Sequence, residues 1–432
     1  MSIEPSTMTP RSHGLWGATA VSAPETVTLR GSAQAEIAII GAGFTGLSAA
    51  LHLTAQGHEV AVIDAGAIGQ GCSGRNGGQV NPGWKLDPNE IARHYEGAWA
   101  DSALHLAKSA VPALSDLVRS EGLDCDFIEN GYVQGAVGAR GLASINQRTA
   151  QWIEHGIDAE VLSRAATADL LGTHAYSGAM VHSQGGNLHP LSYARELARV
   201  VLARGGQIFT GTPAIKAQRG ANDGWIVQTP SGTLESRKLL IATNGYTDGF
   251  WPGLAQAVVS VASALSATDP LPEAVASSIL PGLHSVSETR RIQVYYRMTV
   301  DGRFVIGGRG ATFGRAEDST TTPIRAIAER YFPALKGATW NHDWAGTVAI
   351  TWDHAPKLMA LDEGVFAGMG FNGRGVAMAT AMGGQLARAV RGEATDLPIT
   401  DLYRTPFHAF RKLGVFSTVL RGRMLDRLDQ QA

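Results

Sequence analysis

Cysteine and charge are scarce in this chain of 432 residues, and both absences narrow its possible functions. Only Cys72 and Cys125 are present, in a spacing that suits neither a disulfide framework nor a zinc site. Charged residues make up 17%, and 36 Lys and Arg nearly balance 38 Asp and Glu, which disfavours a nucleic-acid binder. Apolar runs are too short to span a bilayer, and residues 1–35 lack the pattern of a secretion signal. We therefore expect a globular, cytoplasmic protein with small-molecule partners, no metal, no nucleic acid and no transmembrane segment.

Glycine is plentiful, and its first cluster predicts a dinucleotide site. An apolar strand at 37–40 leads into Gly41-Ala42-Gly43-Phe44-Thr45-Gly46, a helix at 47–54 and a second strand at 60–63 that ends at Asp64. The glycines let a pyrophosphate approach the backbone at the helix N-terminus, and the acid suits the ribose hydroxyls. Asp64 lies 21 residues beyond Gly43, close to the spacing of such units. The ordered set of strand, glycines, helix, strand and acid is far more specific than the glycines alone.

A second glycine-rich loop, residues 69–79, follows and indicates which dinucleotide is bound. It carries Arg75 and several hydroxyl or amide groups among its glycines, which suits a chain that wraps around the rest of the same cofactor. With this loop the sequence resembles the D-amino-acid-oxidase-like superfamily of FAD enzymes. Within it, the match is to the gamma-glutamylputrescine oxidase type, in which a Ser-Gly-Arg-Asn-Gly-Gly-Gln loop follows the glycine fingerprint.

The resemblance implies an α/β fold with two intertwined domains. One is an FAD-binding Rossmann-like domain of the glutathione-reductase type, expected at residues 1–90, 178–250 and 345–432. The other is an α+β substrate domain on a mostly antiparallel sheet, expected at residues 91–177 and 251–344, with its first helices (88–119) forming a cap. Strand pairs are predicted at 126–135, around Asn130-Gly131, and at 225–237, with further strands at 291–298, 303–308 and 340–350.

The family's adenine-side contacts map onto Ala214 and onto the turn Thr243-Asn244-Gly245 after the apolar strand 239–242. Near the other end of the chain, the strand 365–369 breaks at Gly370-Phe371-Asn372-Gly373-Arg374-Gly375 before a helix at 376–390. The N-terminus of that helix carries about half a positive charge, which we expect to face the pyrimidine edge of the flavin. The residues expected to hold FAD are Gly41, Gly43, Phe44, Thr45, Gly46, Asp64, Ala65, Cys72, Ser73, Arg75, Asn76, Gly77, Gly78, Gln79, Ala214, Thr243, Asn244, Gly245, Gly370, Phe371, Asn372, Gly373, Arg374, Gly375 and Val376.

Catalytic candidates follow from what a flavin enzyme must add, since the flavin itself accepts the hydride. Lys85 is expected to place a positive charge where oxygen is reduced, or to bind a substrate carboxylate; Arg297 is a candidate carboxylate clamp. Tyr295 and Trp352 are expected in an apolar pocket that keeps a substrate amine neutral, and His354 is read as a turn residue. The aromatic residues considered for this pocket are Trp84, Tyr295, Tyr296, Trp344, Trp352 and Phe371.

The expected activity is oxidation of the C–N bond of an amine, such as gamma-glutamylputrescine, to an imine and then an aldehyde or keto product, with oxygen reduced to hydrogen peroxide. An amino-acid dehydrogenase that passes electrons to quinone and a non-catalytic flavin-binding protein are the alternatives. In the resembled superfamily, relatives of the sarcosine-oxidase type bind flavin covalently through a cysteine. No cysteine lies near Trp352 to Lys357 here, so we expect FAD to be noncovalent. Cys72 is a second departure, since it stands where a small residue such as Ala is expected. The basic, amphipathic tail 407–428 is expected to pack on the protein rather than on a membrane.

Overall fold

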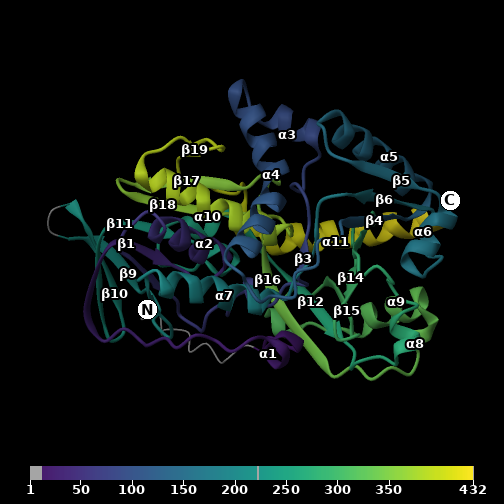
Figure 1. Ribbon diagram of the computed structural model, residues 1–432. Coiled ribbons are helices and arrows are strands. Elements are labelled where there is room, and N and C mark those ends of the chain that lie inside the picture. Colours follow the sequence, from purple (N-terminus) through teal and green to yellow (C-terminus); the bar gives the residue numbers. More distant parts are fainter. Residues whose placement is uncertain (1–11, 221–222, 432) are drawn as a thin grey trace.

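Two large β-sheets organise the chain, with helices on their outer faces (Figure 1). The computed structural model describes residues 12–220 and 223–431. Residues 1–11 of the predicted FAD-binding domain therefore lie outside the described residues. Among the helices of the described part, none combines the length and apolar character needed to cross a membrane.

The first sheet runs in the order β19-β17-β18-β11-β1-β2-β8, and β10 and β9 extend it beside β11. Its central strands, from β18 to β8, are all parallel, as in a doubly wound sheet that places ligands at its carboxyl edge. This arrangement confirms the predicted Rossmann-like fold. Its strands are β1 (Gly31–Ile40), β2 (Val60–Ile63), β8 (Gln207–Phe209), β9 (Lys216–Arg219), β10 (Trp225–Thr229), β11 (Gly232–Ile241), β17 (Lys357–Asp362), β18 (Val365–Met369) and β19 (Ile399–Thr400).

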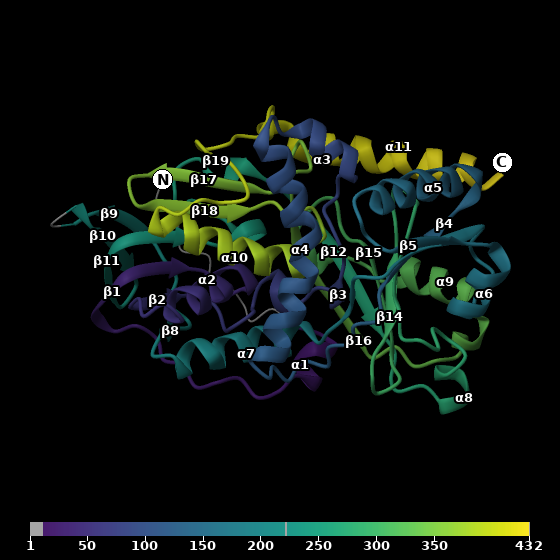
Figure 2. The same ribbon diagram turned by 45° about the horizontal axis from the view of Figure 1, so that its top comes forward.

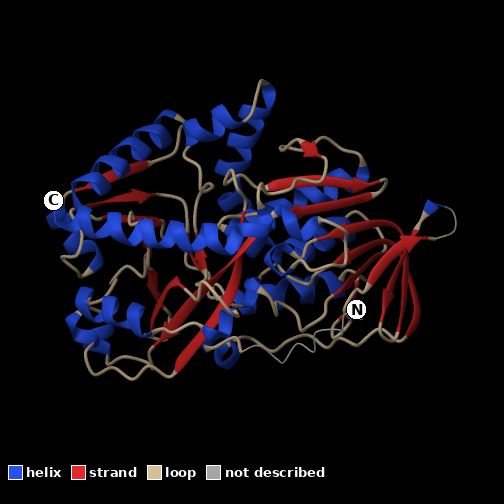
Figure 3. Cartoon of the chain, turned by 180° about the vertical axis from the view of Figure 1, so that it is seen from behind, coloured by secondary structure: helices blue, strands red, loops and turns tan. Residues whose placement is uncertain are grey.

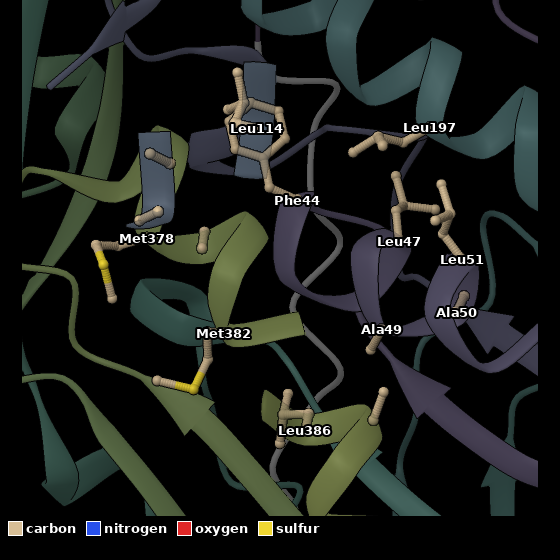
Figure 4. Close-up of a cluster of buried hydrophobic side chains, with 14 of the residues drawn as sticks. Phe44, Leu47, Ala49, Ala50, Leu51, Leu114, Leu197, Met378, Met382 and Leu386 are labelled. Atoms are coloured by element: carbon tan, nitrogen blue, oxygen red, sulfur yellow. The ribbon is translucent and has the colours of Figure 1, made fainter. Parts of the chain in front are cut away.

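One apolar core joins the helices that cover this sheet (Figure 4). Phe44 and Leu47 of α2 (Phe44–Thr54) lie near Leu197 of α7 (Pro190–Ala203). Met382 of α10 (Gly375–Arg391) and Leu114 of α4 (Ala98–Ser120) belong to the same cluster. The assignment of α4 to the substrate domain is thus wrong, because its apolar face is buried against α10 in the first domain.

The second sheet has the order β16-β12-β15-β14-β13-β4-β6-β5. Its neighbours pair antiparallel except β13 and β4, which confirms a second domain on a mostly antiparallel sheet. The strands are β4 (Tyr132–Ala136), β5 (Ala159–Leu162), β6 (Gly178–His182), β12 (Val259–Ala267), β13 (Ser285–Glu288), β14 (Tyr295–Met298), β15 (Phe304–Arg309) and β16 (His342–Ile350). A short pair, β3 (Gln79–Val80) and β7 (Gly186–Asn187), lies apart from both sheets.

Several predicted boundaries are wrong. β6 pairs with β4 and β5, so residues 178–182 belong to the second sheet, and the predicted boundary at 345 cuts through β16. The predicted strand at 126–129 forms only a single bridge, from Ile128 to Asn187, because Asp126 adopts a positive φ of 49°. The predicted pair at 225–237 forms, but its second strand continues without a break through 239–241 as β11.

The remaining helices cover the second sheet or link the two domains (Figure 2). Leu15 and Trp16 of α1 are each 1% exposed and anchor this helix on the protein. These helices are α1 (Leu15–Thr19), α3 (Pro88–His94), α5 (Gly138–Glu154), α6 (Arg164–Leu171), α8 (Glu273–Ala276), α9 (Thr322–Tyr331) and α11 (Arg411–Gln431).

The C-terminal helix α11 crosses the back of the molecule on its outer surface (Figure 3). The Asp426 carboxylate accepts hydrogen bonds from the backbone N–H groups of Arg291 and Ile292, at 3.0 Å each, and from the Arg291 guanidinium at 2.9 Å. These bonds remove residues 291–292 from the predicted strand, so β14 begins only at Tyr295. The tail contacts the protein beside the second sheet rather than in the first domain.

We predict that Asp426→Ala loosens α11 without unfolding the rest of the chain. Losing a buried carboxylate that accepts several hydrogen bonds costs about 1–3 kcal/mol. Hydrogen exchange should therefore accelerate in residues 411–429 and stay unchanged in β1 and α2. Asp401→Ala, at an exposed position, is the matched control. Equal exchange in both variants would show that Asp426 does not anchor the helix.

Candidate active site

A cavity of about 590 Å³ extends between the two sheets. Its walls come from the glycine turn after β1, the loop 70–77, the turn 371–376 and strands β12 to β15 of the second sheet. This volume lies in the range of cofactor and substrate sites. Segments far apart in the sequence therefore meet around one space.

The glycine turn at the start of α2 allows contacts that no side chain would permit. Gly41 has φ +113°, and a Cβ there would lie 2.9 Å from the carbonyl oxygen of Ala242. A Cβ on Gly46 would lie 1.9 Å from the carbonyl oxygen of Gly41. The turn thus packs tightly against β11 and presents backbone to the cavity, as a pyrophosphate site requires.

Asp64 supports this turn and also faces the cavity. Its carboxylate accepts hydrogen bonds from the N–H groups of Ala42, at 2.8 Å, and Gly66, at 2.7 Å. Burial raises the pKa of the carboxyl, whereas the two backbone hydrogen bonds lower it. Each carboxylate oxygen still has a lone pair free for a ribose hydroxyl. Asp64 is therefore placed as the predicted ribose ligand would be.

The second glycine loop is held in shape by Asn76. Its amide donates to the carbonyl oxygens of Cys72 and Ser73, at 3.0 and 2.8 Å, and its Oδ1 accepts from the N–H of Gly78 at 2.8 Å. The Ser73 hydroxyl in turn accepts from the N–H of Phe44 at 2.9 Å, so this loop caps the N-terminus of α2. The two glycine motifs therefore form one structural unit.

Two tryptophans fix the outer side of this loop. Trp16 Nε1 donates to the carbonyl oxygen of Asn76, and Trp344 Nε1 donates to that of Arg75, each at 2.8 Å. Trp344 is only 5% exposed and does not line the cavity, so its predicted place in the substrate pocket is wrong. The indole instead positions the loop from behind.

The predicted adenine and flavin ends lie on the same cavity. Ala214 and Thr243 line it together with Phe250 and Trp251. On the flavin side, Phe371 to Val376 line it at the N-terminus of α10. The backbone of the described residues therefore offers a continuous cradle that fits an extended dinucleotide such as FAD.

Four residues predicted to contact FAD do not line the cavity, and all of them are glycines that permit close backbone approach instead. A Cβ on Gly78 would lie 2.1 Å from the carbonyl oxygen of Leu188, and a Cβ on Gly370 would lie 2.4 Å from the Thr351 side chain. These glycines are Gly46, Gly78, Gly245 and Gly370. The other residues predicted to hold FAD all line the cavity.

Of the four catalytic candidates, Lys85 and Tyr295 line the cavity. The Tyr295 hydroxyl lies 2.9 Å from Ser263 Oγ, and burial raises the pKa of the phenol to about 12, so it remains protonated at neutral pH. Lys85 is exposed on the cavity wall, and desolvation by the surrounding protein lowers the pKa of its ammonium to about 8. The charges of Arg374 and Arg148 act in the same direction.

The other two catalytic candidates are not at the cavity. Arg297 is 2% exposed and donates to the carbonyl oxygens of Leu188, at 2.6 Å, and Gly78, at 3.4 Å, so it supports the second glycine loop and lies away from the cavity that a carboxylate clamp would have to line. Burial lowers its pKa to about 10. Trp352 is 65% exposed and does not line the cavity, so its place in the pocket is wrong.

Two further aromatic predictions are also wrong. Tyr296 points to the opposite side of β14 and donates to the Tyr176 hydroxyl at 2.8 Å, and Trp84 is buried with Nε1 against Met378 Sδ. Phe371 does line the cavity. His354, two residues after Trp352, adopts a positive φ of 58°, which fits the predicted turn.

Sequence reasoning missed the polar wall that the second domain contributes. Tyr132 and Gln134 of β4 and Arg148 of α5 line the cavity, and Arg148 donates to both Gln134 and Asp87. No local motif marks these residues, because only the pairing of β4 with β6 and β13 turns them toward the cofactor loops.

Comparison with known proteins supports this geometry. A family model described as FAD dependent oxidoreductase, DAO, matches residues 36–389. The chain belongs to this family. It is an FAD-dependent oxidoreductase, and its relatives include the probable oxidoreductase OrdL of Rhizobium meliloti (strain 1021), 31% identical over 91% of this chain and 92% of the relative. The gamma-glutamylputrescine oxidoreductase of Escherichia coli (strain K12) is 28% identical over the same shares.

Solved structures share the fold of this FAD-dependent oxidoreductase. Glycine oxidase from Geobacillus kaustophilus has a TM-score of 0.72 at 19% identity and covers 86% of this chain and 99% of its own. L-proline dehydrogenase from P. horikoshii has a TM-score of 0.71 at 20% identity and covers 86% of this chain and 96% of its own.

We predict that Gly43→Leu abolishes FAD binding. A Cβ on Gly43 would lie 2.8 Å from Ser73 Oγ, which caps α2, and the larger side chain would extend into the cradle. The measurement is the flavin-to-protein absorbance ratio of purified protein. Gly414→Val, where a Cβ meets nothing within 4 Å, is the control. A yellow Gly43→Leu variant would contradict the assignment.

Proposed function

We propose that this FAD-dependent oxidoreductase oxidises the C–N bond of a small amine or amino acid, with gamma-glutamyl amines as the leading substrate class. The imine then hydrolyses to an aldehyde or keto product, and oxygen is reduced to hydrogen peroxide. The observation that carries this proposal is the single cavity in which the FAD-binding loops meet Lys85, Tyr295 and the polar wall of the second domain. The printed names of the relatives, which include gamma-glutamylputrescine oxidoreductase and glycine oxidase, support it.

The chain's own task is to keep the substrate amine neutral and correctly placed. Bound FAD supplies the hydride acceptor. Lowering the pKa of an ammonium from about 10 toward 7 requires roughly 4 kcal/mol, which removal from water supplies. Leu265, Phe371 and the ring of Tyr295 provide apolar wall for this purpose. The protonated Tyr295 hydroxyl offers one polar contact within it.

Cationic side chains gather on the polar wall and favour a substrate that also carries a carboxylate. Lys85, Arg148 and Arg374 all line the cavity. Asp87 accepts from Arg148; the charges of Arg374 and Arg148 lower the pKa of Lys85, and those of Asp87 and Glu90 raise it. A gamma-glutamyl amine or an amino acid carries the anionic group that this wall complements.

We further propose that FAD is held without a covalent bond and that the protein works in the cytoplasm. Cys72 is the one cysteine on the cavity wall of the described chain, and burial raises the pKa of its thiol to about 11, which disfavours a reactive thiolate.

The test of this function is an anaerobic bleaching screen with the purified yellow protein. Gamma-glutamyl amines should bleach the flavin, and air should restore the colour with release of hydrogen peroxide. Polyamines that lack a carboxylate should bleach more slowly. Acid precipitation should leave all flavin in the supernatant. Failure of every amine and amino acid to bleach the flavin would overturn the proposal and favour a non-catalytic flavin-binding protein.

The second candidate is a dehydrogenase that passes electrons to quinone. Two features of α11 favour this candidate. Its apolar face is exposed, and its Asp426 accepts hydrogen bonds from the N–H groups of Arg291 and Ile292, which line the cavity. Substrate-dependent reduction of a soluble quinone, with no peroxide formed under air, would select this candidate over the oxidase.

We predict that Lys85→Met slows re-oxidation by oxygen more than anaerobic reduction by substrate. Loss of a preorganised charge at the site where negative charge develops typically costs about 100-fold or more. Stopped-flow measurement of the two half-reactions separates these steps. Lys336→Met, at an exposed position, is the control. Equal slowing of both half-reactions, or a raised KM alone, would assign Lys85 to substrate binding instead.

The same role gives a pH dependence with a fixed sign. Because the pKa of Lys85 is about 8, its side chain is a charged ammonium below that pH and loses its proton and its charge above it. The oxygen reaction of the parent protein should therefore slow as the pH rises through about 8, whereas the reaction of Lys85→Met should show no such fall.

A further inference from the structure

The large apolar side chains of α11, a helix on the outer surface of the molecule (Figure 3), are mostly exposed. At 3.6 residues per turn, five large apolar residues fall within an arc of about 120°. They are between 46% and 61% exposed. These residues, which we call the α11 stripe, are Leu413, Phe416, Leu420, Met424 and Leu428. Phe313 extends the stripe, since it is 51% exposed and its ring centroid lies 5.6 Å from that of Phe416.

The opposite side of α11 is the side that is attached to the protein. Val419, Gly422 and Asp426 are buried there, and a Cβ on Gly422 would lie 3.1 Å from the Ile292 side chain. Asp426 and Asp429 both pair with Arg291. The helix is thus held by ion pairs and close backbone contact, and most of its apolar surface is left uncovered.

The exposed charge around the α11 stripe is entirely basic within the described side chains of residues 411–429. Both acids of this segment are turned toward Arg291, with Asp426 buried and Asp429 half-buried. The exposed charged residues are Lys412, Arg421 and Arg423 at the edges of the stripe, Arg427 within its arc, and Arg411 on the opposite side of the helix. An apolar stripe flanked by basic residues is the pattern of a helix that lies in the interface of a bilayer.

We propose that α11 docks the protein on the surface of an anionic lipid bilayer, with the α11 stripe in the acyl boundary and the arginines at the headgroups. Charge decides between a bilayer and a second copy of this chain. A two-fold dimer would set the same patch against itself and bring the two basic rims together, which is unfavourable. Anionic headgroups complement that rim, and the acyl boundary covers the stripe.

The test is co-sedimentation of the purified FAD-loaded protein with vesicles. The parent should bind vesicles of phosphatidylcholine with phosphatidylglycerol, should bind vesicles of phosphatidylcholine alone far less, and should be released by high salt. The triple variant Arg421→Gln/Arg423→Gln/Arg427→Gln should bind about 100-fold more weakly, given the usual contribution of each basic residue at an anionic surface. Leu420→Ser/Met424→Ser should also lose binding.

Two control variants carry the same chemical changes at exposed positions elsewhere. They are Arg30→Gln/Arg164→Gln/Arg237→Gln, with the same three Arg→Gln changes, and Val27→Ser/Val300→Ser, which likewise replaces two exposed apolar side chains by Ser; both should bind as the parent does. Retained flavin absorbance and an unchanged thermal midpoint show that each variant is folded. Equal binding by α11 and control variants would overturn the proposal. A folded parent protein that does not bind anionic vesicles would also overturn it. That includes a parent that forms a dimer which Leu420→Ser/Met424→Ser abolishes.

Discussion

The close approach of the Gly41–Gly46 turn to its neighbours is the constraint on which the rest of the site depends. β1 and β11 run parallel with Ile40 opposite Ile241, so the turn that follows β1 must pass the backbone of Ala242 at a distance that leaves no room for a Cβ. Because the same turn starts α2, this contact also aims the helix N-terminus at the cavity. The backbone atoms of this turn therefore both pack against β11 and form the predicted site for the pyrophosphate of FAD.

That turn does not act alone, because the second glycine loop completes it. Ser73 caps α2, and Asn76 holds the loop that presents Ser73. Behind the loop stand Trp16 from the N-terminal helix and Trp344 from the second sheet, which bond its outer carbonyl oxygens. The loop is thus pinned by segments from both domains, which ties the position of the second sheet to that of the cofactor cradle.

Short sequence patterns, a run of apolar residues followed by glycines, were enough to predict the turns that form the cofactor cradle. The glycine turn follows buried strand β1, Asp64 follows buried strand β2, and the turn before α10 follows buried strand β18. Residues of both turns and Asp64 line the cavity, as predicted. Long-range packing was not predictable in this way. Tyr295 and Arg297 share one face of β14, yet Tyr295 reaches the cavity while Arg297 ends at the carbonyl oxygen of Leu188 behind the loop. Alternation along a strand gives the face of a side chain but not its depth.

The same limit explains why the C-terminal tail was placed in the wrong domain, and it shows how the tail is connected to the cavity. Its amphipathic pattern predicts a helix that packs, but not which charges hold it. Arg291 lines the cavity and also pairs with Asp426 and Asp429, so the contacts that hold α11 belong to the cavity wall itself. Asp426 and Asp429 accept hydrogen bonds of 2.7–3.0 Å from Arg291, which lies in the turn between β13 and β14, so α11 contacts the cavity wall directly. Because these contacts are directional hydrogen bonds and ion pairs, they specify one position of α11 along the cavity wall, which apolar contacts alone specify less strictly.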